Sequence, residues 1–253
     1  MKYQNCGVRL RRKLFSAGLA EAFCVSFRKG FHKLAWTPLS VNPLLLKSCN
    51  LHKDIKIPSV QECFRLLEQC HVPKHIIRHC QATAGLAVEL AEKIAANGIE
   101  VNVDFVHRAC LLHDIMRVCD FKKPLEHIFD SPADAEDLQK WRELSERYKG
   151  IRHEQAGYEF LKDKYPEIAL AIKKHAYNAL LEKENCPQTI EEKLVYYADK
   201  RAMHDKIVPL AERLEEGHRR NEQKNCQNKL NVQYVDSLIF ELEKELFQLA
   251  AER

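Results

Sequence analysis

Residues 108–118 read RACLLHDIMRV and place His113 and Asp114 directly after the apolar pair Leu111 and Leu112. Imidazole and carboxylate are the side chains that bind borderline divalent metals. A carboxylate at the edge of a helical core is costly unless it is paired or bound to a cation. The stretch therefore predicts an apolar helix that ends on two metal ligands.

Four further positions repeat this combination of an apolar helical segment and a ligand side chain: His79, His153, His175 and Asp199. His79 shares the apolar stripe of its predicted helix, and Asp199 ends the apolar run of residues 194–199. A single buried histidine is more often a core residue with satisfied hydrogen bonds than a ligand. The interpretation therefore rests on the whole set, because all-α proteins build metal centres from ligands on several helices.

The composition favours an all-α fold. Hydrophobic residues make up 45% of the 253-residue chain, whereas Gly and Pro number only 8 and 9. Such a chain can bury a large core and lacks the turn residues of a β-sandwich. The 10 cysteines include no CxxC pair, which indicates reduced thiols in a cytoplasmic protein rather than a disulfide framework or a zinc finger. No apolar run reaches the roughly 20 residues that cross a bilayer.

Charge separates a basic extension from a mildly acidic body. Residues 1–50 carry nine Lys or Arg and one acid, Glu21, so their net +8 leaves −4 of the overall +4 for residues 51–253. Residues 1–57 are predicted to form an irregular, poorly ordered extension, although a targeting segment or a surface-binding arm would have a similar composition. The acidic body argues against a general nucleic-acid binder.

Capping, proline and periodicity signals predict the helices. They are expected at residues 60–70, 73–97, 103–114, 131–148, 153–165, 168–175, 190–214 and 232–249, with loops at residues 121–130 and 176–187. Ser59 and Thr189 each precede a Glu at the third helical position, which predicts two capping boxes. The amphipathic terminal helix could pair with a second copy to form a homodimer, but we expect it to pack on its own domain. We expect no strand of consequence.

In this order the segments resemble the HD-domain superfamily of metal-dependent phosphohydrolases over about residues 59–215. The matching segments are IIRHCQATAGLAVELA (76–91), RACLLHDIMRV (108–118), RHEQAGYEFL (152–161), AIKKHAYNA (171–179) and EEKLVYYADKR (191–201). The resemblance implies an HD-type helical bundle at residues 58–215, followed by a linker and the amphipathic helix at residues 216–253. Within the superfamily the chain is most similar to small bacterial HDIG-type proteins, which include hydrolases of dinucleoside polyphosphates.

The resemblance also implies a set of ligands. The six matching positions are His79, His113, Asp114, His153, His175 and Asp199. His153 and His175 match the extra histidines of the subgroup that binds a second metal, with Asp114 as the bridging ligand, and the other positions match the ligands of the first metal. The mixture of imidazole and carboxylate favours two divalent ions, iron(II) or manganese(II).

The implied activity is hydrolysis of a small phosphoester or phosphoanhydride, with a nucleotide as the expected substrate, by a metal-activated water held at Asp114. Arg117 and Lys200 are the expected phosphate-orienting residues, with Arg201 as a similar candidate. A surface salt bridge is the ordinary alternative for Arg117. Met116 stands where the family often has a small residue, and it could narrow the pocket.

Two alternative functions stay open. Some two-metal HD proteins use a similar ligand set as a di-iron oxygenase, and ligand identity alone does not separate the two reactions. The chain could also be a regulatory module that binds metal and nucleotide with little turnover. The polar helix expected at residues 131–148 could cover the site or form an exterior helix.

Overall fold

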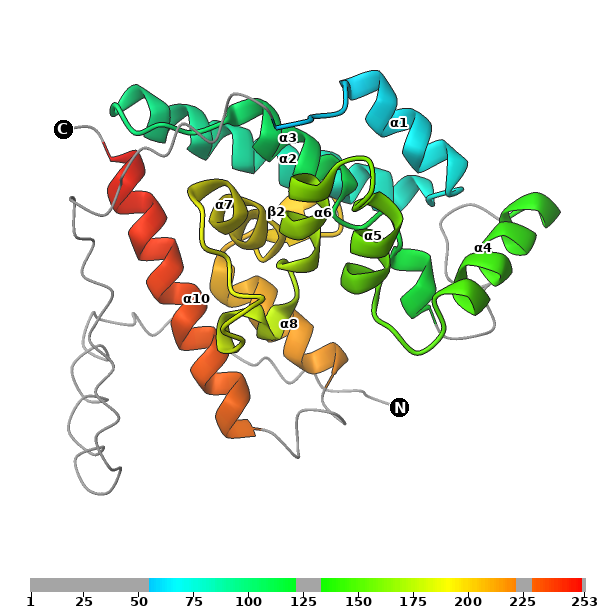
Figure 1. The fold of residues 1–253 in the computed structure, drawn as a ribbon. Coiled ribbons are helices and arrows are strands. Elements are labelled where there is room, and N and C mark those ends of the chain that lie inside the picture. Colours follow the sequence, from blue (N-terminus) through cyan, green and yellow to red (C-terminus); the bar gives the residue numbers. More distant parts are fainter. Residues whose placement is uncertain (1–54, 122–132, 222–228, 252–253) are drawn as a thin grey trace, which may run out of the picture. The chain divides into compact units, whose positions relative to one another are not determined.

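The computed structural model describes residues 55–121, 133–221 and 229–251, which form an all-α fold with one small β-hairpin (Figure 1). The predicted extension, apart from residues 55–57, and the predicted loop at residues 121–130, apart from Phe121, lie outside the described residues. The elements are α1 (Val60–Gln69), α2 (Lys74–Ala96), α3 (Val103–Leu112), η2 (Arg117–Asp120), α4 (Ala135–Arg147), α5 (His153–Leu161), α6 (Pro166–Lys173), η4 (Tyr177–Leu181), α7 (Ile190–Asp199), β1 (Ala202–Met203), β2 (Lys206–Ile207), α8 (Leu210–Arg220) and α10 (Lys229–Ala250).

Capping residues start the first helices where the sequence predicts them. The Ser59 side chain accepts the N–H of Glu62 at the start of α1. The carboxylate of Glu62 instead binds Lys164 at 2.6 Å, so the predicted capping box is only half formed. Pro73 precedes α2, and Gly98 follows it with φ +81°, a left-handed conformation that favours glycine.

Helices α4 and α6 begin at other residues than predicted, and α5 ends at Leu161 rather than before Pro166. The polar helix α4 begins at Ala135 rather than after Ser131, because Asp134 and Asp137 form a capping box at its start. Helix α6 begins at Pro166, two residues earlier than predicted, since proline suits the first helical position. The predicted loop at residues 176–187 contains the short 3₁₀ helix η4.

The single helix predicted at residues 190–214 is wrong. Thr189 and Glu192 form both bonds of the predicted capping box, but α7 ends at Asp199. An antiparallel hairpin of β1 and β2 follows, with a turn in which His204 has φ +57°. Helix α8 then starts after Pro209, a residue that has no N–H to donate within a longer helix.

The terminal helix α10 packs on its own domain, as predicted. It contacts α2, α7 and η4 (Figure 1, red). Its buried face consists of Val235, Ile239, Leu242 and Leu246. The Asn97 side chain at the end of α2 donates to the carbonyl oxygen of Leu249 at 2.8 Å, which ties the two helix ends together.

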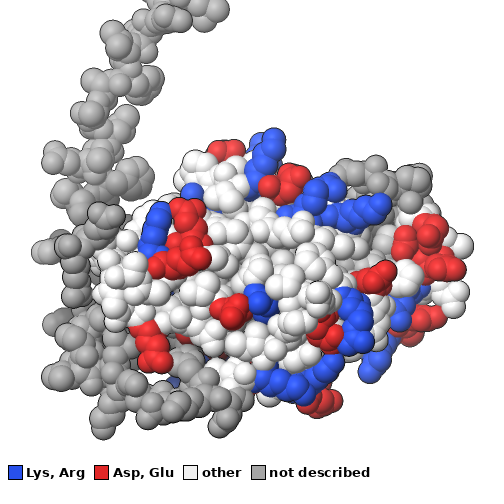
Figure 2. All heavy atoms as spheres, turned by 90° about the horizontal axis from the view of Figure 1, so that it is seen from above, with Lys and Arg blue, Asp and Glu red and all other residues white. Residues whose placement is uncertain are grey.

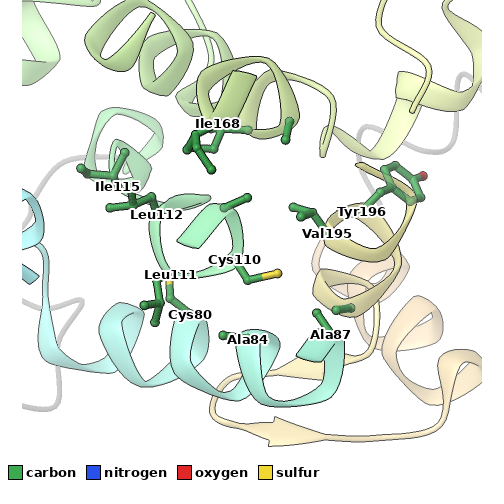
Figure 3. Packing of buried hydrophobic residues seen from close by; sticks show 14 of the residues in the cluster. Cys80, Ala84, Ala87, Cys110, Leu111, Leu112, Ile115, Ile168, Val195 and Tyr196 are labelled. Atoms are coloured by element: carbon green, nitrogen blue, oxygen red, sulfur yellow. The ribbon is translucent and has the colours of Figure 1, made fainter. Parts of the chain in front are cut away.

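The core lies between α2, α3, α6 and α7. Small residues of α2 such as Ala84 and Ala87 lie close to Cys110 and Leu111 of α3, while Val195 of α7 faces them (Figure 3). Small side chains let the helices approach closely, so the ends of neighbouring helices converge. All the cysteines among the described residues are free thiols, as expected, and four of them are buried.

The described surface carries charges of both signs. Figure 2 shows one face on which Lys and Arg side chains alternate with Asp and Glu side chains. On this face the basic side chains do not form the continuous stripe that duplex nucleic acid requires. No helix among the described residues is long and apolar enough to span a membrane.

Candidate metal centre

Helix ends deliver most of the predicted ligands to one place. His113 caps the end of α3 and is followed by Asp114, while His153 opens α5 and Asp199 ends α7. His79 comes from within α2, and His175 follows the end of α6. Because α3 packs against α2, α6 and α7, and α5 packs against α6, these positions converge. The structure therefore brings together all six predicted ligand side chains, and all six residues are buried.

The first group of donors surrounds one side of Asp114. Nε2 of His79 lies 3.2 Å from Nε2 of His113 and 3.1 Å from Oδ1 of Asp199. Oδ2 of Asp114 lies 3.9 Å from Nε2 of His79 and 3.8 Å from Nε2 of His113. Donors bound to one ion at about 2.1 Å are about 3.0–3.4 Å apart. The distances of 3.2 and 3.1 Å lie in that range. The two distances to Oδ2 of Asp114 exceed it by about 0.5 Å, so a small shift of this carboxylate would let the four side chains share one cation.

The second group uses the other oxygen of Asp114. Oδ1 of Asp114 lies 3.0 Å from Nε2 of His153 and 3.7 Å from Nε2 of His175. The two Nε2 atoms are 3.2 Å apart. One carboxylate thus faces two pairs of histidines, which is the arrangement that a bridging ligand requires.

The outer nitrogen of each ring has a hydrogen-bond acceptor. Nδ1 of His79, His113 and His175 bonds to the carbonyl oxygens of His204, Cys110 and Ile172, at 2.8, 2.8 and 2.5 Å. Nδ1 of His153 bonds to Oδ2 of Asp120 at 2.6 Å. A carbonyl or carboxylate oxygen can only accept, so each Nδ1 carries a proton, and Nε2 is the nitrogen that a metal can bind when it displaces any proton held there.

This hydrogen bonding gives the centre its chemistry. Four Nε2 lone pairs and two carboxylates converge in a buried space, where they repel one another unless positive charge lies between them. Imidazole and carboxylate together suit divalent transition metals. The side chains present therefore fit divalent metal ions. Three groups of potential ligands lie among the described residues, and one of them adds Glu154 to the predicted set: His79, His113 and Asp199; His113, Asp114 and His175; His153, Glu154 and His175.

The pKa shifts of the two carboxylates also favour cation binding. Burial raises the pKa of Asp114, but Arg117, His113 and His153 outweigh it and hold that pKa well below its usual value. Burial likewise opposes ionisation of Asp199, yet Lys200 and the neighbouring histidines keep its pKa low. Burial lowers the pKa of His153, but Asp114 and Asp120 outweigh burial and raise it. Both carboxylates are therefore ionised and favour cations on the Nε2 side of the rings.

The predicted phosphate-orienting residues lie beside the centre but differ in their partners. Nη1 of Arg117 lies 3.1 Å from Nε2 of His153, and 33% of its side chain is exposed. Lys200 is buried, and its Nζ donates to the carbonyl oxygen of His175 at 2.8 Å and to Oδ2 of Asp199 at 2.6 Å. Arg201 points elsewhere, because its guanidinium binds the carbonyl oxygen of Val208 and the side chains of Tyr197 and Glu243.

Sequence reasoning missed three partners of the ligand rings. Asp120 binds His153, the carbonyl oxygen of His204 binds His79, and the buried Glu154 lies 3.3 Å from Nδ1 of His153. The sequence does hold a signal for Glu154, which directly follows the predicted ligand His153, because ligating histidines commonly bind carboxylates; Asp120 lies 33 positions from His153 and has no such signal. No signal marks the carbonyl oxygen.

Met116, which the sequence suggests could narrow the pocket, is fully buried and belongs to the hydrophobic core cluster. An open groove of about 290 Å³ is lined by residues of α1, α2 and α3, among them Phe64, Ala84 and Val88. None of the six ligand residues lines that groove.

Comparison with known proteins supports this geometry. The sequence model of the HD domain matches residues 76–204, a stretch that contains all six ligand positions. A tRNA (cytidine(56)-2'-O)-methyltransferase of Picrophilus torridus is 26% identical over 165 residues, which are 65% of this chain and 42% of that protein. The chain thus spans less than half the length of this relative. No solved structure matches the chain significantly.

Proposed function

Because the chain belongs to the HD domain family, we propose that it hydrolyses a phosphoester or phosphoanhydride bond of a nucleotide, with two divalent ions bridged by Asp114. The HD domain and the His/Asp clusters identify the broader class, a metal-dependent phosphohydrolase. The observation that carries the two-ion proposal is the position of Asp114, whose two oxygens face different pairs of histidines.

We assign His79, His113 and Asp199, with Oδ2 of Asp114, to the first ion. His153 and His175, with Oδ1 of Asp114, are assigned to the second. Iron(II) and manganese(II) are the proposed metals because the donors mix imidazole and carboxylate. When bound, such ions polarise phosphoryl oxygens and lower the pKa of a bound water enough for hydroxide to form near neutral pH.

The remaining roles belong to cationic side chains at the edge of the centre. The partly exposed guanidinium of Arg117 lies against the His153 ring, so its remaining N–H groups can fork onto a phosphate. Lys200 holds Asp199 and the backbone of His175 in place. An ammonium has three N–H donors, so Lys200 can also offer one to a phosphate oxygen.

The proposal that the substrate is a nucleotide rests on the family resemblance rather than on the geometry of the site. The cationic groups argue for a phosphorylated substrate, whereas the nucleotide rests on the resemblance to HDIG-type proteins, including hydrolases of dinucleoside polyphosphates. The methyltransferase relative carries no weight here, because this chain spans only 42% of it. The division into an HD-type domain at residues 58–215 and a following segment at residues 216–253 is likewise part of the proposal.

Product analysis tests the proposal directly: orthophosphate reports cleavage of a nucleotide or a simple phosphoester, and chromatography reports the two nucleotides that cleavage of a dinucleoside polyphosphate yields. Protein loaded anaerobically with manganese(II) or iron(II) is offered nucleotides, dinucleoside polyphosphates and simple phosphoesters. Asp114→Ala serves as the inactive variant, and Asp236→Asn, which changes a hydrogen-bonded carboxylate on α10, serves as the control. We expect phosphate from nucleotides with wild type and control but none with Asp114→Ala. Oxygen uptake by iron-loaded protein without phosphate release would favour the oxygenase instead.

A further inference from the structure

Asp120 holds His153 through two hydrogen bonds. Oδ2 of Asp120 lies 2.6 Å from Nδ1 of the ring, and Oδ1 accepts the backbone N–H of the same residue at 3.2 Å. His153 is the first residue of α5, and the preceding Arg152 makes no side-chain cap. Asp120, the last residue of η2, therefore fixes both the start of this helix and the direction of its ring.

This contact sets His153 apart from the other three histidines. Their Nδ1 atoms bond to uncharged backbone carbonyls of Cys110, Ile172 and His204. A carboxylate is a stronger acceptor than a carbonyl, and it makes the ring a more basic ligand through its opposite nitrogen. Nε2 of His153 faces Oδ1 of Asp114, on the side of the proposed second ion.

The competing partners of Asp120 are weaker. The guanidinium nitrogens of Arg152 and Arg117 lie 3.9 and 4.0 Å from Oδ2, at the limit of an ion pair and beyond hydrogen-bond distance. Glu154 also approaches Nδ1 of His153, at 3.3 Å. Its two oxygens, however, bind Arg152 at 3.0 and 2.8 Å. Asp120 is thus the main anionic partner of Nδ1 of His153.

We infer that Asp120 is a positioning residue for the second ion: it orients His153 and strengthens binding at that site without affecting the first. The inference rests on the proposed two-ion function. Loss of a carboxylate behind a ligating histidine costs about 10- to 100-fold in metal affinity. Removal of Asp120 should therefore weaken the second ion by that factor.

The test measures metal binding by the full chain. Manganese(II) is titrated calorimetrically into metal-free wild type, Asp120→Ala, Asp120→Asn and the control Asp236→Asn. The control also breaks a carboxylate–histidine pair, the 2.7 Å contact of Asp236 with His218. Electron paramagnetic resonance then reports the coupled manganese pair that a shared Asp114 would produce.

The expected results distinguish the role of Asp120 from the two-ion proposal on which it rests. Wild type and control should bind two ions per chain. Asp120→Ala should bind the second ion about 10- to 100-fold more weakly and lose the coupled signal. The affinity of Asp120→Asn for the second ion should lie between those of wild type and Asp120→Ala, because asparagine keeps one acceptor oxygen. If wild type binds two ions but both Asp120 variants keep the second within twofold, or lose both ions equally, the positioning role is overturned. A wild type that binds only one ion would overturn the two-ion proposal as well. If Asp120→Ala fails to fold, Asp120→Asn decides by the same criteria.

Discussion

Asp114 faces His153 with Oδ1, which lies 3.0 Å from Nε2 of that ring. The other oxygen lies 3.8 Å from Nε2 of His113. Asp199, by contrast, contacts only the first pair of histidines, at 3.1 and 3.4 Å. The two acids therefore have different predicted effects on metal content.

Replacing Asp114 should disturb both ions, whereas replacing Asp199 should disturb one. We expect Asp114→Asn to retain less than one manganese ion per chain after gel filtration, and Asp199→Asn to retain about one, because only Asp114 contacts both histidine pairs. Metal analysis measures the content. Equal manganese content in the two variants would contradict the bridging role of Asp114. Asp236→Asn controls for metal that is lost through general destabilisation of the fold.

Metal stabilisation should grow with pH. Burial lowers the pKa of His113, but Cys80 and Asp114 outweigh it and raise that pKa well above 6.5; Asp114 and Asp120 raise the pKa of His153 as well. In the metal-free protein, raised pKa values stabilise the fold below the unfolded pKa of about 6.5, and this stability is lost as pH rises through the folded pKa. Binding at Nε2 displaces these protons, so affinity rises with pH.

Thermal unfolding with and without manganese(II) measures this linkage. The difference in Tm between loaded and metal-free protein should increase between about pH 6 and pH 8, where histidine protons compete with metal. Burial and the neighbouring histidines lower the pKa of His175, so this ring contributes less to the increase than His113 and His153. A Tm difference independent of pH would show that no proton leaves on binding.

A buried ion pair beside the centre should dominate local stability. Nζ of Lys174 lies 2.7 and 2.8 Å from the oxygens of Glu192, and both residues are buried. Glu192→Ala leaves the ammonium unpaired and removes the capping box of α7, so we expect a loss of about 3–5 kcal/mol in urea unfolding. The exposed pair of Glu89 and Lys93 gives the control, since Glu89→Ala should cost less than about 1 kcal/mol. Similar losses in the two variants would contradict this.

The sequence predicts this fold well where local chemistry decides it. Thr189 caps α7 and Gly98 follows α2 because their roles depend only on nearby backbone groups. The end of α7 at Asp199 was missed because the apolar pattern continues through residues 210–214, although Pro209 signals a break. The ligands on the helices could be predicted because histidine and aspartate are typical metal-binding residues. Asp120, however, lies 33 positions from His153 in the sequence, and only tertiary packing creates their contact.

The stability of the hairpin turn at His204 should depend on the backbone conformation of this residue rather than on the chemistry of its side chain. His204 is exposed, has φ +57°, and places its carbonyl oxygen 2.8 Å from Nδ1 of His79. His204→Gly keeps that conformation and should leave stability within about 1 kcal/mol. His204→Val, a β-branched residue disfavoured at positive φ, should cost about 1–3 kcal/mol and weaken the first ion. Urea unfolding and manganese titration measure both effects; equal behaviour would refute the conformational role.

Arg117→Lys should separate substrate binding from metal binding. Lysine keeps the charge but loses the planar fork that can bind two phosphate oxygens. A lost charge-assisted hydrogen bond costs about 1.5–3 kcal/mol, which corresponds to about a 10- to 100-fold lower kcat/KM. Manganese content should stay at the wild-type level, because the guanidinium contacts the His153 ring without being among the donors. The matched control is Arg65→Lys, at a side chain that is 70% exposed and paired with Glu62. Unchanged kinetics would leave Arg117 as a surface ion-pair residue, while lost manganese would mean that it supports His153 instead.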